Sequence, residues 1–269
     1  MGIVEVAIDY AAPFFLISSP ITSYADQIIS IYRTRSSTGF SLDIPLIMLV
    51  SSFLKIFYWF GEYYSAALLV QAVVMVLVQV TLLKVALDNR PSPGARDGIE
   101  HVPFTGHQIG FSRPYDFWQW RNTKPYWLFL AYFNLGLLLL HLTPISESDT
   151  YISILGCVGL AVEATLPLPQ IWANYQSGSC KGFRLSVVAA WIIGDTMKMS
   201  YFFFSTEDIP LVFKVCGVFQ CACDFFLGFQ FWMYSRTPGK VASNSHELQE
   251  NRWEAGEKDI RMTRMSMSS

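Results

Sequence analysis

Ionisable side chains lie inside stretches of this sequence that are otherwise almost entirely apolar. The acidic ones are Glu163, Asp195 and Asp224, and the basic ones are Lys55 and Lys198. Ionisable groups are costly in lipid, so in membrane helices they usually face a bundle interior or a wet cavity and mark the path of an ion or a polar substrate. Their type and setting therefore predict binding and passage of a polar group.

Polar residues and prolines recur at helical spacing around these charges. Glu163, Pro167 and Gln170 are spaced i, i+4 and i+7, so they share one helix face. Pro167 removes a backbone hydrogen bond and Pro169 interrupts the next turn, which frees carbonyl groups that need a partner or water. This pattern favours a polar route along the segment.

Two further stripes are formed by Trp191, Asp195 and Lys198 in the sixth predicted helix and by Gln220 and Asp224 in the seventh. The three stripes are expected to converge on one pathway. An alternative is a structural network in which Asp195 and Lys198, three residues apart on one helix, only neutralise each other. The residues predicted to line the pathway are Glu163, Pro167, Pro169, Gln170, Asn174, Trp191, Asp195, Lys198, Gln220, Asp224, Asp26, Gln27 and Lys55.

Patterns for hydrolysis, redox chemistry or metal binding are absent from the sequence. It has no HExxH, no GxSxG and no nucleotide-binding loop, and its four histidines are scattered. The five cysteines form no CxxC pair, which argues against a zinc site or a disulfide framework. We therefore expect no enzyme, no catalytic residue, no metal, no cofactor and no nucleic-acid partner.

Composition predicts an all-α membrane protein. Hydrophobic residues make up 52% of the 269 positions and charged residues only 15%, whereas about 25% of a typical soluble domain is charged. A spanning helix needs about 20 mostly apolar residues, and open strands are not tolerated in lipid. The predicted transmembrane helices are 10–32, 43–61, 64–87, 126–143, 151–175, 185–204 and 210–234.

An internal repeat organises these seven helices. Moving the second half back by 143 residues without a gap places Gln170 on Gln27 and Lys198 on Lys55, and the register holds over 34 residues. Such self-similarity indicates a duplication. Each copy has three helices and one helix separates the copies, so two parallel three-helix bundles with a linker helix (3+1+3) are predicted.

The predicted organisation follows from this repeat and from the polar stretches. The first three-helix bundle is expected within 1–87, the linker transmembrane helix at 126–143 and the second bundle at 151–234. Residues 88–125 are expected to form a cytosolic loop. Residues 235–269 are polar and serine-rich and are expected to be a disordered cytosolic tail, a candidate for binding a cytosolic partner.

Lysine and arginine predict the orientation. The stretches 33–42, 88–125 and 176–184 and the C-terminal tail contain Lys or Arg, whereas the loops between them contain acidic residues and neither base. Cytosolic loops are the basic ones, so the N-terminus is predicted to be luminal and the C-terminus cytosolic. The aromatic run 115–120 is expected at the headgroup level of the membrane.

The Pro169-Gln170 pair, in a helix repeated within a seven-helix chain, resembles the PQ-loop family, which includes relatives of the SWEET sugar transporters and the lysosomal cystine and cationic amino-acid exporters. With Glu163, Asp195 and Lys198, the segment is similar to the Golgi and endosomal two-repeat branch linked to phospholipid asymmetry and scrambling. The first repeat departs from the motif, since Asp26-Gln27 stands where Pro-Gln would be.

This resemblance implies an ATP-independent phospholipid scramblase that acts on membrane lipid asymmetry, with phospholipids and the membrane as partners. Two alternatives stay open. One is a proton-coupled exporter of a small amino-acid or sugar-like solute, in a lysosomal or vacuolar membrane, and the other is an adaptor that works through its tail. A polar stripe open to lipid favours scrambling, and an enclosed cavity between the bundles favours export.

Overall fold

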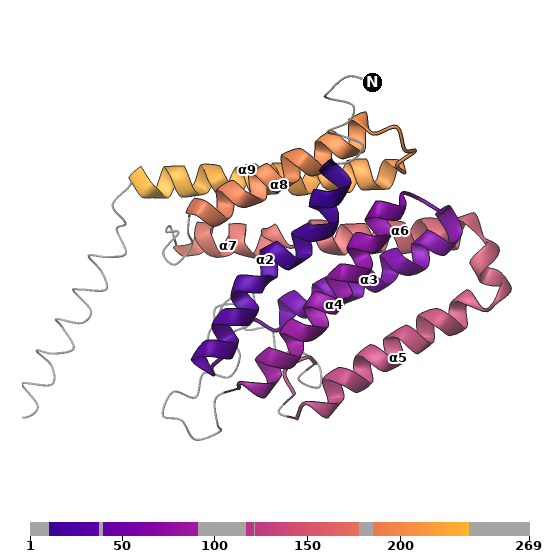
Figure 1. The fold of residues 1–269 in the computed structure, drawn as a ribbon, viewed down its shortest axis with the longest axis horizontal. Helices are drawn as coiled ribbons and strands as arrows, with labels where there is room; N and C mark the ends of the chain where they lie inside the picture. Colours follow the sequence, from indigo (N-terminus) through magenta and orange to yellow (C-terminus); the bar gives the residue numbers. More distant parts are fainter. Residues whose placement is uncertain (1–10, 38–39, 91–116, 121, 178–184, 237–269) are drawn as a thin grey trace, which may run out of the picture.

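Every regular element that the structure describes is helical. The structure, a computed structural model, describes residues 11–37, 40–90, 117–120, 122–177 and 185–236 (Figure 1). Within these residues, the helical stretches long and apolar enough to cross a membrane are Asp43–Glu62, Ala66–Asp88, Asp149–Trp172 and Leu211–Tyr234. The prediction of an all-α integral membrane protein is confirmed.

The helices follow the predicted segments to within a few residues. In chain order they are α2 (Ala12–Thr34), α3 (Asp43–Glu62), α4 (Ala66–Asp88), α5 (Lys124–His141), the 3-10 helix η3 (Pro144–Glu147), α6 (Asp149–Ala164), α7 (Pro167–Ser177), α8 (Leu185–Phe204) and α9 (Leu211–Arg236). Large apolar side chains such as Leu77, Tyr132 and Phe204 are exposed on their outer faces. Such a surface suits contact with lipid rather than water.

The fifth predicted helix, 151–175, is in fact two helices. A tight turn at Thr165 and Leu166 separates α6 from α7, and the Leu166 amide donates to the Glu163 carbonyl at 3.1 Å. Pro167 has no amide hydrogen to continue α6, and proline is well tolerated as the first residue of the next helix. The prolines therefore divide this segment into two helices just after Glu163.

Helix packing follows the internal repeat. In the first half α4 packs against α2 and α3, and in the second half α9 packs against α6, α7 and α8. The two halves meet where α3 contacts α6 and where α2 contacts α8. A shift of 143 residues carries α2 onto α6 and α7, α3 onto α8, and α4 onto α9, so each contact in one half has its equivalent in the other.

Glycines let α3 and α6 approach closely. A Cβ atom added at Gly156 of α6 would lie 2.8 Å from the Tyr58 ring of α3, and one added at Gly61 of α3 would lie 2.6 Å from Ile152 of α6. Small residues permit close packing of membrane helices, where dispersion replaces the hydrophobic driving force. The contact between the two halves therefore depends on these glycines.

A shared apolar core joins both halves at the C-terminal end of α3. This shared core includes Leu54, Tyr58, Tyr64, Leu155, Leu160, Tyr201, Phe202 and Phe213. A polar chain closes the same end, because the hydroxyls of Ser65 and Tyr201 lie 2.7 Å apart and Tyr201 donates to Glu207 at 2.9 Å. The halves are thus held together most firmly at the end of α3 that carries Tyr58.

Trp118, from the aromatic run predicted at the headgroup level, is buried inside the first half of the molecule. It is 1% exposed, and its indole N–H donates to the Leu42 carbonyl at 2.7 Å. The Tyr126 hydroxyl donates to the Trp118 carbonyl at 3.2 Å. An indole ring surrounded by apolar neighbours, with its N–H satisfied, is stable in such a core. These contacts attach the start of α5 to the first half.

Candidate functional site

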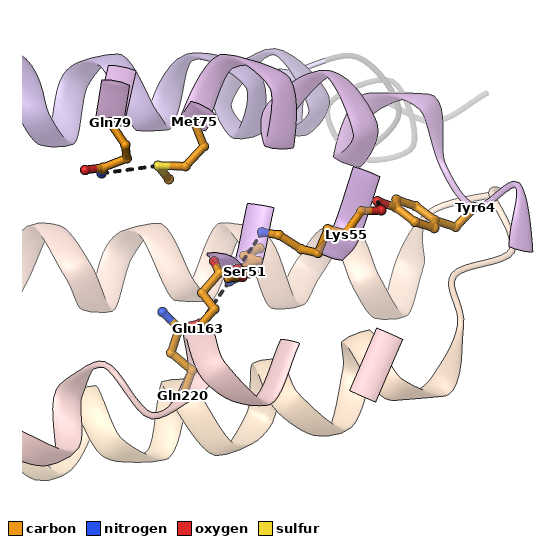
Figure 2. A network of polar contacts seen from close by, with 8 residues as sticks. Ser51, Lys55, Tyr64, Met75, Gln79, Glu163 and Gln220 are labelled. Carbon is orange, nitrogen blue, oxygen red and sulfur yellow. Dashed lines mark hydrogen bonds and ion pairs between the residues drawn. The ribbon is translucent and has the colours of Figure 1, made fainter. Parts of the chain in front are cut away.

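Three polar side chains from two helices surround the Glu163 carboxylate. The Lys55 ammonium lies 2.5 Å from Glu163 Oε2, and the Ser51 hydroxyl donates to the same oxygen at 3.3 Å (Figure 2). The Lys198 ammonium lies 3.8 Å from Glu163 Oε1. We call Lys55, Glu163 and Lys198 the charge cluster. It places two cations around one carboxylate in a mostly apolar interior.

The internal repeat explains how the two lysines meet. Lys55 on α3 and Lys198 on α8 are equivalent positions, separated by the 143-residue shift. They approach Glu163, at the end of α6, from the two halves of the molecule. The position equivalent to Glu163 is Pro20, so the second half alone supplies the acid. Lys55 and Lys198 are therefore related by the repeat, and their shared anion is not.

A small cavity adjoins the charge cluster. Lys198 donates to Gln220 Oε1 at 3.0 Å, and Figure 2 shows Gln220 close to Glu163, on the side away from Lys55. The cavity is lined by Lys55, Leu68, Gln71, Leu160, Glu163, Lys198, Phe202, Phe213, Cys216, Gly217 and Gln220. Its volume of about 20 Å³ is enough for about one water molecule. A lipid headgroup or an amino acid does not fit a space of this size.

Asp195 of α8 and Asp224 of α9 form a second polar contact beside the charge cluster. They are 7% and 4% exposed, and their carboxyl groups lie within hydrogen-bonding reach of each other. Lys198 acts on Asp195 as a nearby charge, but its ammonium donates to Gln220 and approaches Glu163. Lys198 is therefore shared among several groups and is not paired with Asp195 alone.

Amides link α7 to α9 one to two turns beyond the break. Gln170 donates to Asn174 at 2.9 Å, and Asn174 donates to Gln230 at 3.4 Å. Gln230 in turn donates to the Ile171 carbonyl at 3.1 Å. Because buried amides need partners, this chain of hydrogen bonds gives α7 polar groups on its α9 side. These amides place further polar groups along α7 and α9, at a distance from Glu163.

Comparison with known proteins agrees with this repeated architecture. The family model of the PQ loop repeat matches residues 21–68 and 151–211. Each half of the chain therefore contains one segment that matches the PQ-loop repeat. It is also 29% identical to a Saccharomyces cerevisiae protein named Scramblase ANY1, over 293 aligned residues that cover 87% of this chain and 72% of the relative. The predicted resemblance to the PQ-loop family is confirmed.

The second PQ-loop repeat supplies most of the predicted pathway residues that the structure brings together. Glu163 and Lys198 join Lys55 of the first repeat, Asp195 meets Asp224, and Gln220 meets Lys198. Pro167 and Pro169 begin α7, and Gln170 and Asn174 follow on the same helix. The predicted convergence of three stripes therefore has a structural counterpart in α6 to α9.

Three predicted pathway residues lie on outer surfaces of the PQ-loop repeats instead. Asp26 and Gln27 are exposed on α2, and Trp191 is 38% exposed on α8. Tyr24 and Ile28 of the same helix pack against buried residues of the first half, so Asp26 and Gln27 stand on its outer face. Helical spacing places Trp191 on the same face as Asp195, but spacing alone does not specify how far the contacts with other helices extend along that face.

Several polar residues of the site were not predicted. Ser51 binds Glu163, Gln71 lines the cavity and Gln230 binds Asn174. Gln79 is fully buried, and within the described part of the chain its Oε1 atom has no hydrogen-bond partner. Uncharged amides and hydroxyls inside apolar segments were the sequence signal that could have identified these residues. Ser51, for example, precedes Lys55 by four residues, which places both on one helix face.

Proposed function

We propose that this protein is an ATP-independent phospholipid scramblase that acts on membrane lipid asymmetry. The observation that carries the proposal is a series of buried polar contacts along α9, in which Gln220 meets Lys198 beside Glu163, Asp224 meets Asp195, and Gln230 meets Asn174. Similarity to a protein named as a scramblase supports it. The proposed activity changes no covalent bond, so this reading includes no enzyme and no cofactor.

The physical reason is the cost of moving a charged headgroup through hydrocarbon. Burying its charges unpaired is prohibitive, whereas successive polar partners lower the barrier in small steps. Weak contacts suffice, because each site must also release its lipid. The acyl tails stay in the bilayer while the headgroup follows the polar groups.

Widening of this small cavity is part of the proposal. The turn at Thr165 and Leu166 lies between α6, which packs on α3 and α9, and α7, which packs on α9. Non-helical backbone at membrane depth is tolerated where it lines protein or water. A change of angle at this turn moves Glu163 and widens the cavity beside it.

We propose the 3+1+3 arrangement for the membrane-embedded protein. The two repeats form parallel three-helix bundles, α5 is the linker helix, the N-terminus is luminal and the C-terminus cytosolic. Packing that follows the repeat and the Lys and Arg distribution support this orientation. A Golgi or endosomal membrane is the proposed location, and phospholipids are the proposed partners, with a cytosolic protein for the tail.

A solute exporter is the second candidate, and the position of the cavity favours it. Its lining combines Lys55 and Gln71 from the first half with Lys198 and Gln220 from the second. A site between repeats is the arrangement of alternating-access transporters. In that case the cavity takes a small amino-acid or sugar-like solute, with protons as the coupling ion.

Purified protein in liposomes separates the two candidates. With a tail-labelled fluorescent phospholipid, we expect the protein to expose the inner-leaflet label to an impermeant quencher without ATP, whereas empty liposomes keep that label protected. A folded protein that leaves the inner-leaflet label protected, yet drives uptake of a small solute, contradicts scrambling and supports export.

Cysteine labelling tests the orientation. In a background with the five native cysteines replaced by serine, we expect Gly178→Cys to react with an impermeant reagent in sealed vesicles whose cytosolic face is outward. The matched variant Glu147→Cys lies on the predicted luminal side and should stay protected until the vesicles are opened. The opposite pattern would show that the orientation is inverted.

A further inference from the structure

The two lysines of the charge cluster are unequally satisfied. Lys55 makes a direct ion pair with Glu163, to which Ser51 also donates. Lys198 donates to the neutral Gln220 at 3.0 Å and reaches Glu163 only at 3.8 Å. An ammonium group has three hydrogens to donate. The charged side chains that line the cavity are two cations and one anion, and the buried Asp195–Asp224 pair lies within electrostatic reach of Lys198.

We propose that Lys55 and Lys198 form a binding site for the headgroup phosphate of a phospholipid, and that Glu163 occupies the phosphate position while the site is empty. The proposal rests on the proposed scrambling function and names the chemical group that this site recognises. Lysine binds phosphate through its charge, and charge-assisted hydrogen bonds are the stronger ones. The phosphate is the part that all phospholipid headgroups have in common.

Exchange of one anion for another makes this site physically reasonable. Removing Glu163 without replacement would leave a buried cation unpaired, which costs several kcal/mol in a protein interior. An incoming phosphate takes over the lysines as Glu163 leaves, so the number of paired charges stays constant. The barrier to opening is then lower in the presence of lipid than in its absence.

The position of Glu163 provides for its release. It lies two residues before the turn at Thr165, close to where α6 and α7 separate. The cavity of about 20 Å³ is smaller than a phosphate group, so binding requires Glu163 to move. A rotation at the turn displaces this carboxylate, while Lys55 on α3 and Lys198 on α8 keep their places.

Two lipids that share a ceramide backbone test the proposal. Tail-labelled sphingomyelin has a phosphate in its headgroup, and tail-labelled glucosylceramide has a neutral sugar. We expect Lys198→Met to slow sphingomyelin scrambling about tenfold, the usual effect of losing one charge-assisted contact, with the glucosylceramide rate unchanged. Lys198→Arg should retain most of the activity, and Lys84→Met, at an exposed position of α4, should resemble the wild type.

Each other outcome is decisive. Equal slowing of both lipids by Lys198→Met would overturn phosphate recognition while leaving scrambling intact. Wild-type protein that moves neither lipid would overturn the proposed function itself. Uptake of inorganic phosphate by liposomes in which neither lipid moves would assign the site to a soluble phosphate and overturn the lipid. If melting shows Lys198→Met to be unfolded, Lys198→Gln, which keeps a donor and removes the charge, takes its place with the same expected result.

Discussion

Replacing Glu163 by alanine is expected to destabilise the folded protein by about 3–5 kcal/mol, the range for leaving a buried charge without its partner. The change removes the only carboxylate within ion-pair distance of Lys55 and Lys198 in the described part of the chain. The Lys55 and Glu163 side chains are only 8% and 11% exposed, so solvent screens this pair little. Thermal unfolding of the purified protein in detergent measures the loss.

A double variant separates the ion pair from other effects of the substitution. Lys55→Met alone should cost less than Glu163→Ala, because Lys198 remains near Glu163. Lys55→Met combined with Glu163→Gln should recover a substantial part of the stability, since it removes charges of both signs. A double variant no more stable than Glu163→Ala would show that the pair is not the source of the loss.

Substituting leucine for Gly156 is expected to separate α3 from α6 and lower stability by about 1–3 kcal/mol or more, the range for overpacking a well-packed site. The Tyr58 ring, 2.8 Å from an added Cβ, has little room to move. It packs against the rings of Tyr64 and Phe213, with centroids 5.4 and 6.2 Å away. A lower melting temperature and loss of a single species in size-exclusion chromatography are the expected readouts.

Another glycine offers a matched control for this substitution. Gly136 lies in the apolar helix α5, and a Cβ atom added there meets nothing within 4 Å. Gly136→Leu should therefore melt like the wild type. Combining Gly156→Leu with Tyr58→Ala should restore part of the lost stability, because the smaller side chain makes room. Equal behaviour of Gly136→Leu and Gly156→Leu would argue that the close approach is unimportant.

Periodicity, apolar length and self-similarity predicted the parts of this fold that depend on local sequence. Runs of about 20 apolar residues located the helices, and the repeat identified Lys55 and Lys198 as equivalent positions. The prolines predicted a disturbance after Glu163. Its form, a turn between two helices, depends on which carbonyl accepts the Leu166 amide, and a sequence pattern does not specify this.

Contacts between distant segments could not be predicted in the same way. Lys198 lies one turn from Asp195 on α8, and sequence spacing alone favours that pair. The flexible lysine stem instead reaches Gln220 on α9 and approaches Glu163 on α6, because helix rotation sets which neighbour is nearest. The burial of Trp118 likewise depends on the chain folding back to the Leu42 carbonyl.

The two partners of the buried Lys55–Glu163 ion pair are synthesised at different times. Lys55 and Glu163 are 108 residues apart, and synthesis at about 5–20 residues per second separates them by roughly 5–20 s. During that interval α3 carries a lysine for which the first half offers no carboxylate at this site. Such a lysine draws water into the membrane or pulls the helix toward the interface. A ribosome that stops before α6 therefore leaves a half-inserted chain, with a membrane defect that only the second repeat removes.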